Sequence, residues 1–245
     1  MKRQKISNTR SIAPVISFRY PTTDPLFPER LKEKQRLLRD GFPEPLALRV
    51  HRALSWLRRA EDLYDDVDVR FVLLWIGFNA AYAGPRKGSV LQEERELERS
   101  IFGEFFKVLN ELDKERRIYD IIHGRFSHEI RTLLNNQHVF HPFWQHVNDV
   151  PGFQDWEQML ANSRKRINRA YVDSDTPTIL SILFGRLYVL RNQIMHGSAT
   201  WNSSVNRDQV RDGASVLASL LPVFIDIMMD NPQYPWSDTQ YPVVE

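Results

Sequence analysis

Residues 180–197 read LSILFGRLYVLRNQIMHG. The apolar residues recur at three- and four-residue steps, the spacing of one buried helix face: Leu183, Leu187, Leu190 and Ile194. A polar cluster follows, and Gly197 ends the pattern as a helix C-cap does. Arg191 lies four residues after Leu187, so it emerges beside the apolar face. Because a charged group next to a packed surface needs a partner or a ligand, we predict a functional site at this helix end.

Helical periodicity extends along most of the chain. Residues 45–66 are amphipathic, and residues 69–82 are apolar nearly all round, which predicts a central buried helix. Residues 173–177 offer an N-terminal cap for the helix quoted above, and 206–229 predict a long helix after it. The sequence shows no alternation typical of strands, so it predicts an all-α fold. Further helical patterns cover 25–40, 90–112, 115–136 and 154–171.

Composition divides this fold into parts. Residues 1–24 mix Lys, Arg, Ser, Thr and Pro and predict a flexible basic arm, while 232–245 predict an irregular tail. The composition shifts after the second long helix, and residues 85–174 are interpreted as a helical insertion. The core of the bundle is then expected from residues 25–84 and 175–231.

Bulk composition excludes several classes of protein. The chain is 42% hydrophobic and 26% charged, with a net charge of only +2, unlike a polycation. The absence of cysteine excludes disulfides and thiolate metal sites and fits a reducing compartment. No signal-peptide pattern follows the basic start, and the longest apolar runs, 71–84 and 216–229, are shorter than the roughly 20 residues that span a bilayer. We therefore expect a soluble, cytoplasmic protein with no membrane segment.

The polar cluster combines Arg191, Asn192 and His196. Five positions separate Arg191 from His196, so about 140° lies between them on one helix. The two groups meet if the helix, stopped by Gly197, unwinds near His196, or if two copies of the helix meet across a two-fold axis. An imidazole exchanges protons near neutral pH, and a guanidinium holds a phosphate by parallel hydrogen bonds. The trio therefore suits cleavage of RNA without a metal, with the 2′-hydroxyl as nucleophile.

Residues 191–196 (RNQIMH) resemble the Arg-polar-x-x-x-His motif of HEPN domains, the all-helical module of many prokaryotic toxins and defence ribonucleases. The context is also similar: the motif ends one helix, a long helix follows, and WIGFNAAYAG (75–84) is similar to the family's second core helix. The resemblance implies a HEPN-like up-and-down bundle and a homodimer with a composite site. It also implies endoribonuclease activity giving 2′,3′-cyclic phosphate ends, no cofactor, and Arg191 and His196 as catalytic residues supported by Asn192.

The same resemblance implies a role in a toxin–antitoxin or phage-defence system, with RNA as substrate and an antitoxin or defence protein as a further partner. Some members bind without cutting, so the alternative is a non-catalytic module that recognises RNA, a nucleotide or a protein. HEPN toxins controlled by AMPylation often carry a tyrosine two residues after the histidine. Ser198 stands there in this sequence, and the nearest aromatic residue is Trp201. This departure argues against that mode of control.

Other interpretations accompany this hypothesis. Arg191 and His196 are alternatively structural residues that stabilise helix ends, and Asn79 is either a satisfied core group or a neighbour of the site. Three histidines lie close together in the sequence and could bind a metal: His138, His141 and His146. Aromatic residues lie between them, so we expect aromatic packing and no metal site. A basic run is a weaker candidate for RNA binding, or a solvated helix end: Arg164, Lys165, Arg166 and Arg169.

Overall fold

Helices form nearly all of the regular structure in the computed structural model, which describes residues 17–84 and 93–241, with the backbone alone described for 93–101. No strand occurs in these described ranges, so the predicted all-α fold is confirmed. In chain order the α-helices are Pro28–Leu38 (α1), Glu44–Asp62 (α2), Val67–Tyr82 (α3), Glu93–Leu112 (α4), Arg117–Asp120 (α5), Ser127–Asn135 (α6), His141–Val147 (α7), Trp156–Val172 (α8), Thr176–Met195 (α9) and Arg207–Asp230 (α10).

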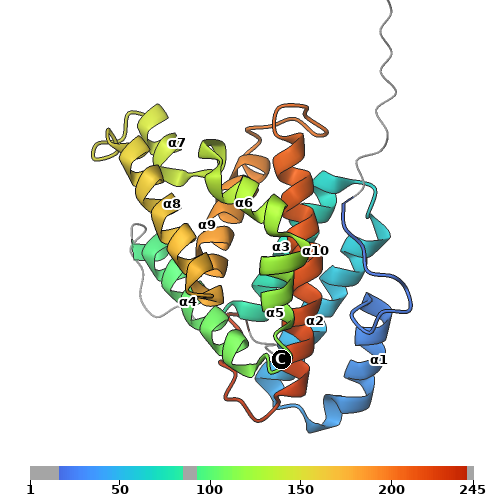
Figure 1. Cartoon of the computed structure of the whole chain (residues 1–245). Coiled ribbons are helices and arrows are strands. Elements are labelled where there is room, and N and C mark those ends of the chain that lie inside the picture. The colour runs from blue at the N-terminus through green and yellow to red at the C-terminus, as the bar shows by residue number, and fades with distance from the viewer. Residues whose placement is uncertain (1–16, 85–92, 242–245) are drawn as a thin grey trace, which may run out of the picture.

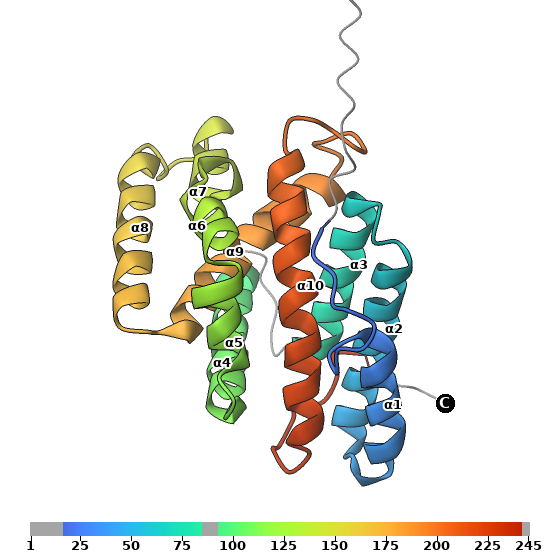
Figure 2. The same cartoon turned by 45° about the vertical axis from the view of Figure 1, so that its right-hand side comes forward.

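The helices form a bundle around α10 (Figure 1). On one side of α10 lie α1, α2 and α3, and on the other lie α4 to α8 (Figure 2). α9 crosses between the two sides and contacts α3, α4, α6, α8 and α10. The helix that carries the polar cluster is therefore also the helix that joins the two halves of the molecule.

Aromatic side chains fill the centre where these helices meet. The ring centroid of Phe78 in α3 lies 4.4 Å from that of Phe184 in α9, and Phe106 of α4 lies 4.8 Å from Phe184. Such rings bury large apolar areas, which dominate the stability of a core. At Gly213, near the start of α10, an added Cβ would lie 3.1 Å from side chains of α9 and α3, so the glycine permits their close approach.

The segment from 115 to 136 differs from the expectation of one helix. α5 passes into a π-helical turn, Ile121–Arg125 (η2), in which the Phe126 N–H donates to the Ile121 carbonyl at 3.0 Å. A new helix, α6, then starts at Ser127. The apolar residues keep helical spacing across this break, which is why periodicity alone predicted a continuous helix.

Residues 17–20 contact the bundle, which differs from the expectation of a flexible arm over 1–24; residues 1–16 lie outside the described residues. The Tyr20 hydroxyl donates to the Ser219 carbonyl of α10 at 3.0 Å, and the Phe18 N–H donates to the Ser215 hydroxyl at 3.0 Å. Burial raises the pKa of Tyr20 to about 12.

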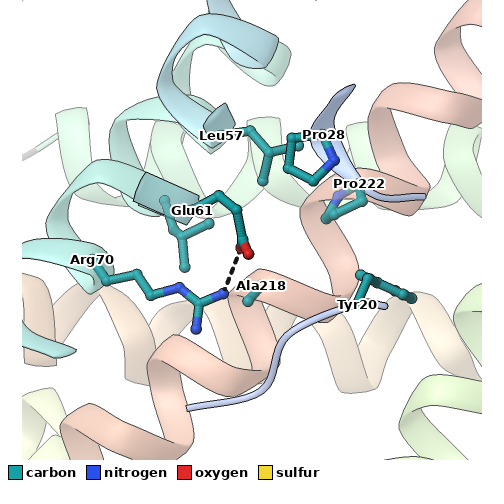
Figure 3. Close-up of a pocket in the computed structure, with 8 residues that line it drawn as sticks. Tyr20, Pro28, Leu57, Glu61, Arg70, Ala218 and Pro222 are labelled. Carbon is teal, nitrogen blue, oxygen red and sulfur yellow. Dashed lines mark hydrogen bonds and ion pairs between the residues drawn. The ribbon is translucent and has the colours of Figure 1, made fainter. Parts of the chain in front are cut away.

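A buried ion pair lies beneath this segment (Figure 3). The Arg70 guanidinium of α3 donates to Glu61 of α2 at 3.3 Å and also to the Ser17 hydroxyl, and Arg19 pairs with the same carboxylate. The Arg70 side chain is only 2% exposed, and burial lowers its pKa. These contacts join the N-terminal segment to α2 and α3.

The expected tail, 232–245, has no helix in its described part, 232–241, and this part is anchored to the bundle. The buried Arg49 side chain of α2 donates to the Ser237 and Asp238 carbonyls at 3.0 and 2.9 Å and to the Ala81 carbonyl at 2.8 Å. Burial lowers the pKa of Arg49 to about 10.

α10 is long and apolar enough to cross a membrane, judged by length and composition. It exceeds the apolar run seen in the sequence because the helix already begins at Arg207. The most apolar window of α10 is entirely buried among the other described helices. A buried core helix passes the same test, so this helix is weak evidence for a membrane span.

Candidate functional site

The polar cluster lies at the C-terminal end of α9. This helix begins at a cap, where the Asp175 carboxylate accepts the Thr178 N–H at 3.1 Å. On its apolar face Leu183, Leu187 and Leu190 are fully buried, which fixes the rotation of the helix, and Ile194 at its end is partly buried. The residues at the end of α9 are therefore held by the core beneath them.

A Schellman motif ends the helix. Gly197 adopts a φ of 68°, in the left-handed region, and the Ser198 N–H donates to the Gln193 carbonyl at 2.9 Å. The Gly197 N–H donates to the Ile194 carbonyl at 3.2 Å. This hydrogen-bond pattern fixes His196 as the C-cap, with helical structure unbroken through Met195.

Arg191 is half-buried beside the apolar face. Its Nη1 donates to the Asn192 carboxamide oxygen at 2.8 Å, and its guanidinium carbon lies 6.0 Å from the centroid of the Tyr188 ring. Among the described residues no carboxylate and no backbone carbonyl bonds to this guanidinium. Its positive charge is thus oriented by a neutral amide and left without a counter-ion, which suits an anionic ligand.

His196 is exposed at the helix end. Its backbone N–H donates to the Asn192 carbonyl at 3.0 Å, while its ring makes no hydrogen bond to any described residue. The imidazole is therefore open to a ligand. Its position at the negative pole of the helix dipole also fits the structural alternative.

The two groups are not joined within one chain. No hydrogen bond links Arg191 to His196 in the part of the chain that the structure describes, and helical spacing puts about 140° between their positions. The helix ends at Met195 and His196 is its C-cap, so the chain leaves the helix near His196, but the His196 ring makes no hydrogen bond to the guanidinium. The second route, a second copy of α9 from another protomer, stays a prediction.

The loop after the motif is clamped to the N-terminus of α3. Arg207 and the Asn202 N–H both donate to one oxygen of Asp68, at 2.7 and 3.0 Å, and the Trp201 indole N–H donates to Asp66 at 3.1 Å. Asp66 also caps α3 through the Val69 N–H. Trp201 as a whole residue remains 72% exposed, so an aromatic side chain lies at the surface of the loop that follows His196.

Sequence reasoning did not identify this clamp. The cluster of aspartates before the apolar helix signals an N-cap. Its partners, however, lie 134 to 139 residues further along the chain, where no local pattern connects them. Asn79 lies at the opposite end of α3, because Phe78 packs on Phe184 whereas Phe71 lies near Leu190. It is therefore not a neighbour of the cluster.

The four basic residues of α8 do not form one surface. Arg164 donates to the Asn135 carbonyl at 2.9 Å, and Arg169 pairs with Asp173 at 3.3 Å. Lys165 and Arg169 share one face of the helix, whereas Arg164 and Arg166 flank the buried side. The pattern of contacts thus resembles a solvated helix end more than one continuous RNA-binding strip.

The three closely spaced histidines pack against different aromatic rings. His138 lies edge-on to Phe143 at 5.4 Å, His141 lies 6.1 Å from Phe153, and His146 lies 6.2 Å from Trp156. Within the described ranges no group of three His, Asp or Glu side chains is arranged to hold a metal ion. One link runs from here to the candidate site: the Gln193 side chain of α9 donates to the His138 carbonyl at 2.7 Å.

Fold and site together define an all-α bundle with an oriented cation and an exposed imidazole at one helix end. Comparison with known proteins adds no assignment, because no protein-family model, curated protein or solved structure matches the chain significantly.

Proposed function

We propose that this chain is a metal-independent endoribonuclease of the HEPN type, acting as a toxin or defence effector. The observation that carries the proposal is the state of Arg191, a half-buried guanidinium that Asn192 orients and no described carboxylate neutralises. Because no described counter-ion occupies this guanidinium, an anion can bind it without breaking an existing ion pair. A phosphodiester is an anion that this group holds by parallel hydrogen bonds.

The proposed reaction needs no group beyond these side chains and the RNA. The 2′-hydroxyl attacks the adjacent phosphorus, the bond to the 5′-oxygen breaks, and the products carry a 2′,3′-cyclic phosphate and a 5′-hydroxyl. His196 moves the protons as acid or base, and Arg191 stabilises the negative charge of the pentavalent state. In the proposed homodimer, the Arg191 of one protomer and the His196 of the other form one site; the absence of a hydrogen bond between them within the described part of one protomer supports this arrangement.

The test is an RNA-cleavage assay with end-group analysis. Arg191→Ala and His196→Ala are each expected to lower the cleavage rate at least a hundredfold while the helical circular-dichroism signal is unchanged. Arg36→Ala and His128→Ala are matched controls, because both side chains are exposed and bond to no described residue. Activity is expected to survive a chelator.

Two results would decide against the proposal. Cleavage at the wild-type rate by both site variants would show that the site is wrongly assigned. Retention of RNA without strand scission at any pH would favour the alternative, a non-catalytic module that binds RNA, a nucleotide or a protein partner.

A further inference from the structure

Three aromatic side chains, where α5, the π-turn η2 and α8 meet, form a stack with an arginine at each end. The His123 ring stacks on Tyr119 with centroids 4.0 Å apart and lies edge-on to Tyr171 at 5.2 Å. The guanidinium carbon of Arg116, the N-cap of α5, lies 4.1 Å from the centroid of the Tyr119 ring. That of Arg131, in α6, lies 4.1 Å from the centroid of the Tyr171 ring. We call these five residues the stacked cluster.

Both arginines of the stacked cluster keep their hydrogen-bond donors available. Arg116 and Arg131 are exposed, and neither guanidinium makes a hydrogen bond or an ion pair with any residue that the structure describes. A guanidinium that lies over a ring still directs its N–H groups outward in its own plane. There they suit a phosphate, which they hold by parallel hydrogen bonds.

The charges that act on the stacked cluster are positive. Burial, followed by the charges of the two arginines, lowers the pKa of His123, and no described carboxylate opposes them. Two carboxylates lie in the same stretch of chain. Of these, Glu129 lies close enough to Asp212 of α10 to add to the burial that raises the pKa of Asp212, and Asp120 bonds to neither arginine. Because the whole chain has a net charge of only +2, this is a local positive surface that attracts anions.

The backbone around the stacked cluster adopts conformations that lower stability. Arg116 has a φ of 57°, in the left-handed region that residues other than glycine rarely adopt. His123 lies in the π-turn Ile121–Arg125, and such turns occur often at functional sites. Strained backbone persists where the position of a side chain matters for function. Both features therefore support a role in binding rather than in stability.

The stacked cluster lies on the side of α9 that leads to the polar cluster. α5, α6 and α8 lie on the same side of α10 (Figure 2), and α6 contacts α9. The segment after α6 reaches the end of α9, where Gln193 donates to the His138 carbonyl at 2.7 Å. Arg131 precedes His138 by only about 10 Å of helical rise. A nucleic-acid strand that advances about 3.4 Å per nucleotide spans this interval with a few nucleotides.

We propose that the stacked cluster is a second contact surface for the RNA, at which Arg116 and Arg131 each hold a phosphate a few nucleotides from the scissile bond. The choice of RNA as the polyanion rests on the proposed function. Because these contacts are made to the backbone, they favour longer RNA without selecting a base sequence.

The first experiment measures RNA binding by the full chain without cleavage. The probe is a 2′-O-methylated oligomer of about 15 nucleotides, longer than the interval to Arg131, and its binding is followed by fluorescence anisotropy over a series of salt concentrations. Arg116→Asn and Arg131→Gln are each expected to weaken binding about tenfold at low salt. Each is also expected to reduce the slope of log K against log salt by about 0.7, the effect of one phosphate contact on a single strand.

Two comparisons separate binding from stability and from bulk charge. Asparagine tolerates the left-handed region, so the melting temperature of Arg116→Asn is expected to equal or exceed that of the wild type while its RNA binding weakens. A purely structural role would lower the melting temperature as well. Arg36→Gln, an exposed position in α1 on the other side of α10, removes the same charge and is expected to leave binding unchanged.

The second experiment measures cleavage as a function of RNA length. For the long RNA, Arg131→Gln is expected to raise KM about tenfold and to leave kcat unchanged. For a dinucleotide, which reaches only the polar cluster, the same variant is expected to change neither constant.

The outcomes distinguish this inference from the proposed function. If the wild type cuts RNA and both arginine variants bind and cut long RNA as it does, or if Arg36→Gln weakens binding equally, the stacked cluster is no RNA surface and the ribonuclease proposal stands. Binding of polyglutamate as tight as that of RNA would assign the surface to an acidic protein instead. If the wild type binds RNA through these arginines but cuts none, the surface is supported and the ribonuclease proposal fails. Absence of any RNA binding by the wild type would overturn both.

Discussion

His123 shows how one residue makes the stability of this fold depend on pH. Its ring stacks on Tyr119 with centroids 4.0 Å apart and lies edge-on to Tyr171 at 5.2 Å, within the π-turn that separates α5 from α6. The buried Nε2 atom has no hydrogen-bond partner. Burial, followed by the charges of Arg131 and Arg116, lowers the pKa of His123 below its usual value of 6.5.

The sign of the effect follows from linkage. Below pH 6.5 the unfolded chain binds a proton at His123 that the folded chain resists, so this residue lowers the free energy of unfolding as the pH falls. His123→Phe keeps the ring contacts and removes the titration. We expect its melting temperature to fall less between pH 7 and pH 5 than that of the wild type. His128→Phe, at an exposed position, is the control; equal slopes in all three proteins would contradict the assignment.

Arg191 shows which features of a single residue the sequence predicts. The position of Arg191 beside the apolar face follows from its spacing to Leu187, and the structure places it half-buried there. The sequence does not predict the hydrogen bond from Arg191 to the Asn192 side chain, because that bond depends on side-chain rotamers, which residue spacing does not determine. Whether Arg191 meets His196 stays a prediction, since it depends on contacts beyond a single chain.

Among the helices, α9 begins and ends where its capping residues predict. Asp175 caps its start and Gly197 ends it, and both types of residue stabilise helix ends through their own backbone geometry. Within 115–136 the apolar pattern is continuous, and no capping side chain marks the start of α6 at Ser127. Helix boundaries were thus predictable where a capping residue was present, and were missed where a π-turn replaced one.

The end of α9 gives a prediction for an element. Gly197→Ala places a side chain at a φ of 68°, and because an added Cβ would meet no atom within 4 Å, the cost is purely conformational. We expect the free energy of unfolding to fall by about 1 kcal/mol. Since the Schellman motif holds His196 at the C-cap, we also expect RNA cleavage to slow.

Urea denaturation and the cleavage assay check this prediction. Gly197→Asn is expected to lower the free energy of unfolding by less than Gly197→Ala does, because asparagine tolerates the left-handed region. Gly41→Ala is the matched control, since an added Cβ there also meets no atom within 4 Å but its φ is not in the left-handed range. If Gly197→Ala matched Gly41→Ala in stability, the conformational account would be wrong.

At the scale of the whole molecule, long-range polar contacts determine where a segment lies, which its local composition does not predict. Residues 17–20 read as an arm because their partners, Glu61, Ser215 and Ser219, lie far along the chain. The Glu61–Arg70 pair at this junction is nearly inaccessible to solvent, with side-chain exposures of 9% and 2%. Breaking such a pair leaves an uncompensated buried charge.

Glu61→Gln is therefore expected to lower the free energy of unfolding by about 3 kcal/mol. The double variant Glu61→Leu with Arg70→Met removes both charges and is expected to recover most of this loss. Glu29→Gln, which breaks an exposed pair with Arg58 at 3.8 Å, is expected to cost under about 1 kcal/mol. Chemical denaturation measures all three; a Glu61→Gln variant as stable as Glu29→Gln would refute a role for burial.

The final prediction concerns the assembly that the proposed reaction requires. Helical spacing puts about 140° between Arg191 and His196, the C-cap of α9, and no hydrogen bond joins them within the described part of one protomer. The proposed composite site therefore takes the arginine of one protomer and the histidine of another. Arg191→Ala and His196→Ala are each inactive alone under this arrangement. After subunit exchange, half of the dimers contain one copy of each variant, and one of their two sites has both groups intact. We expect the mixture to regain about a quarter of the wild-type cleavage rate.

A double variant carrying both substitutions, mixed with either single variant, is the control and is expected to regain none. An inactive mixture in which heterodimers are shown to form would place both groups within one protomer and rule out the composite site.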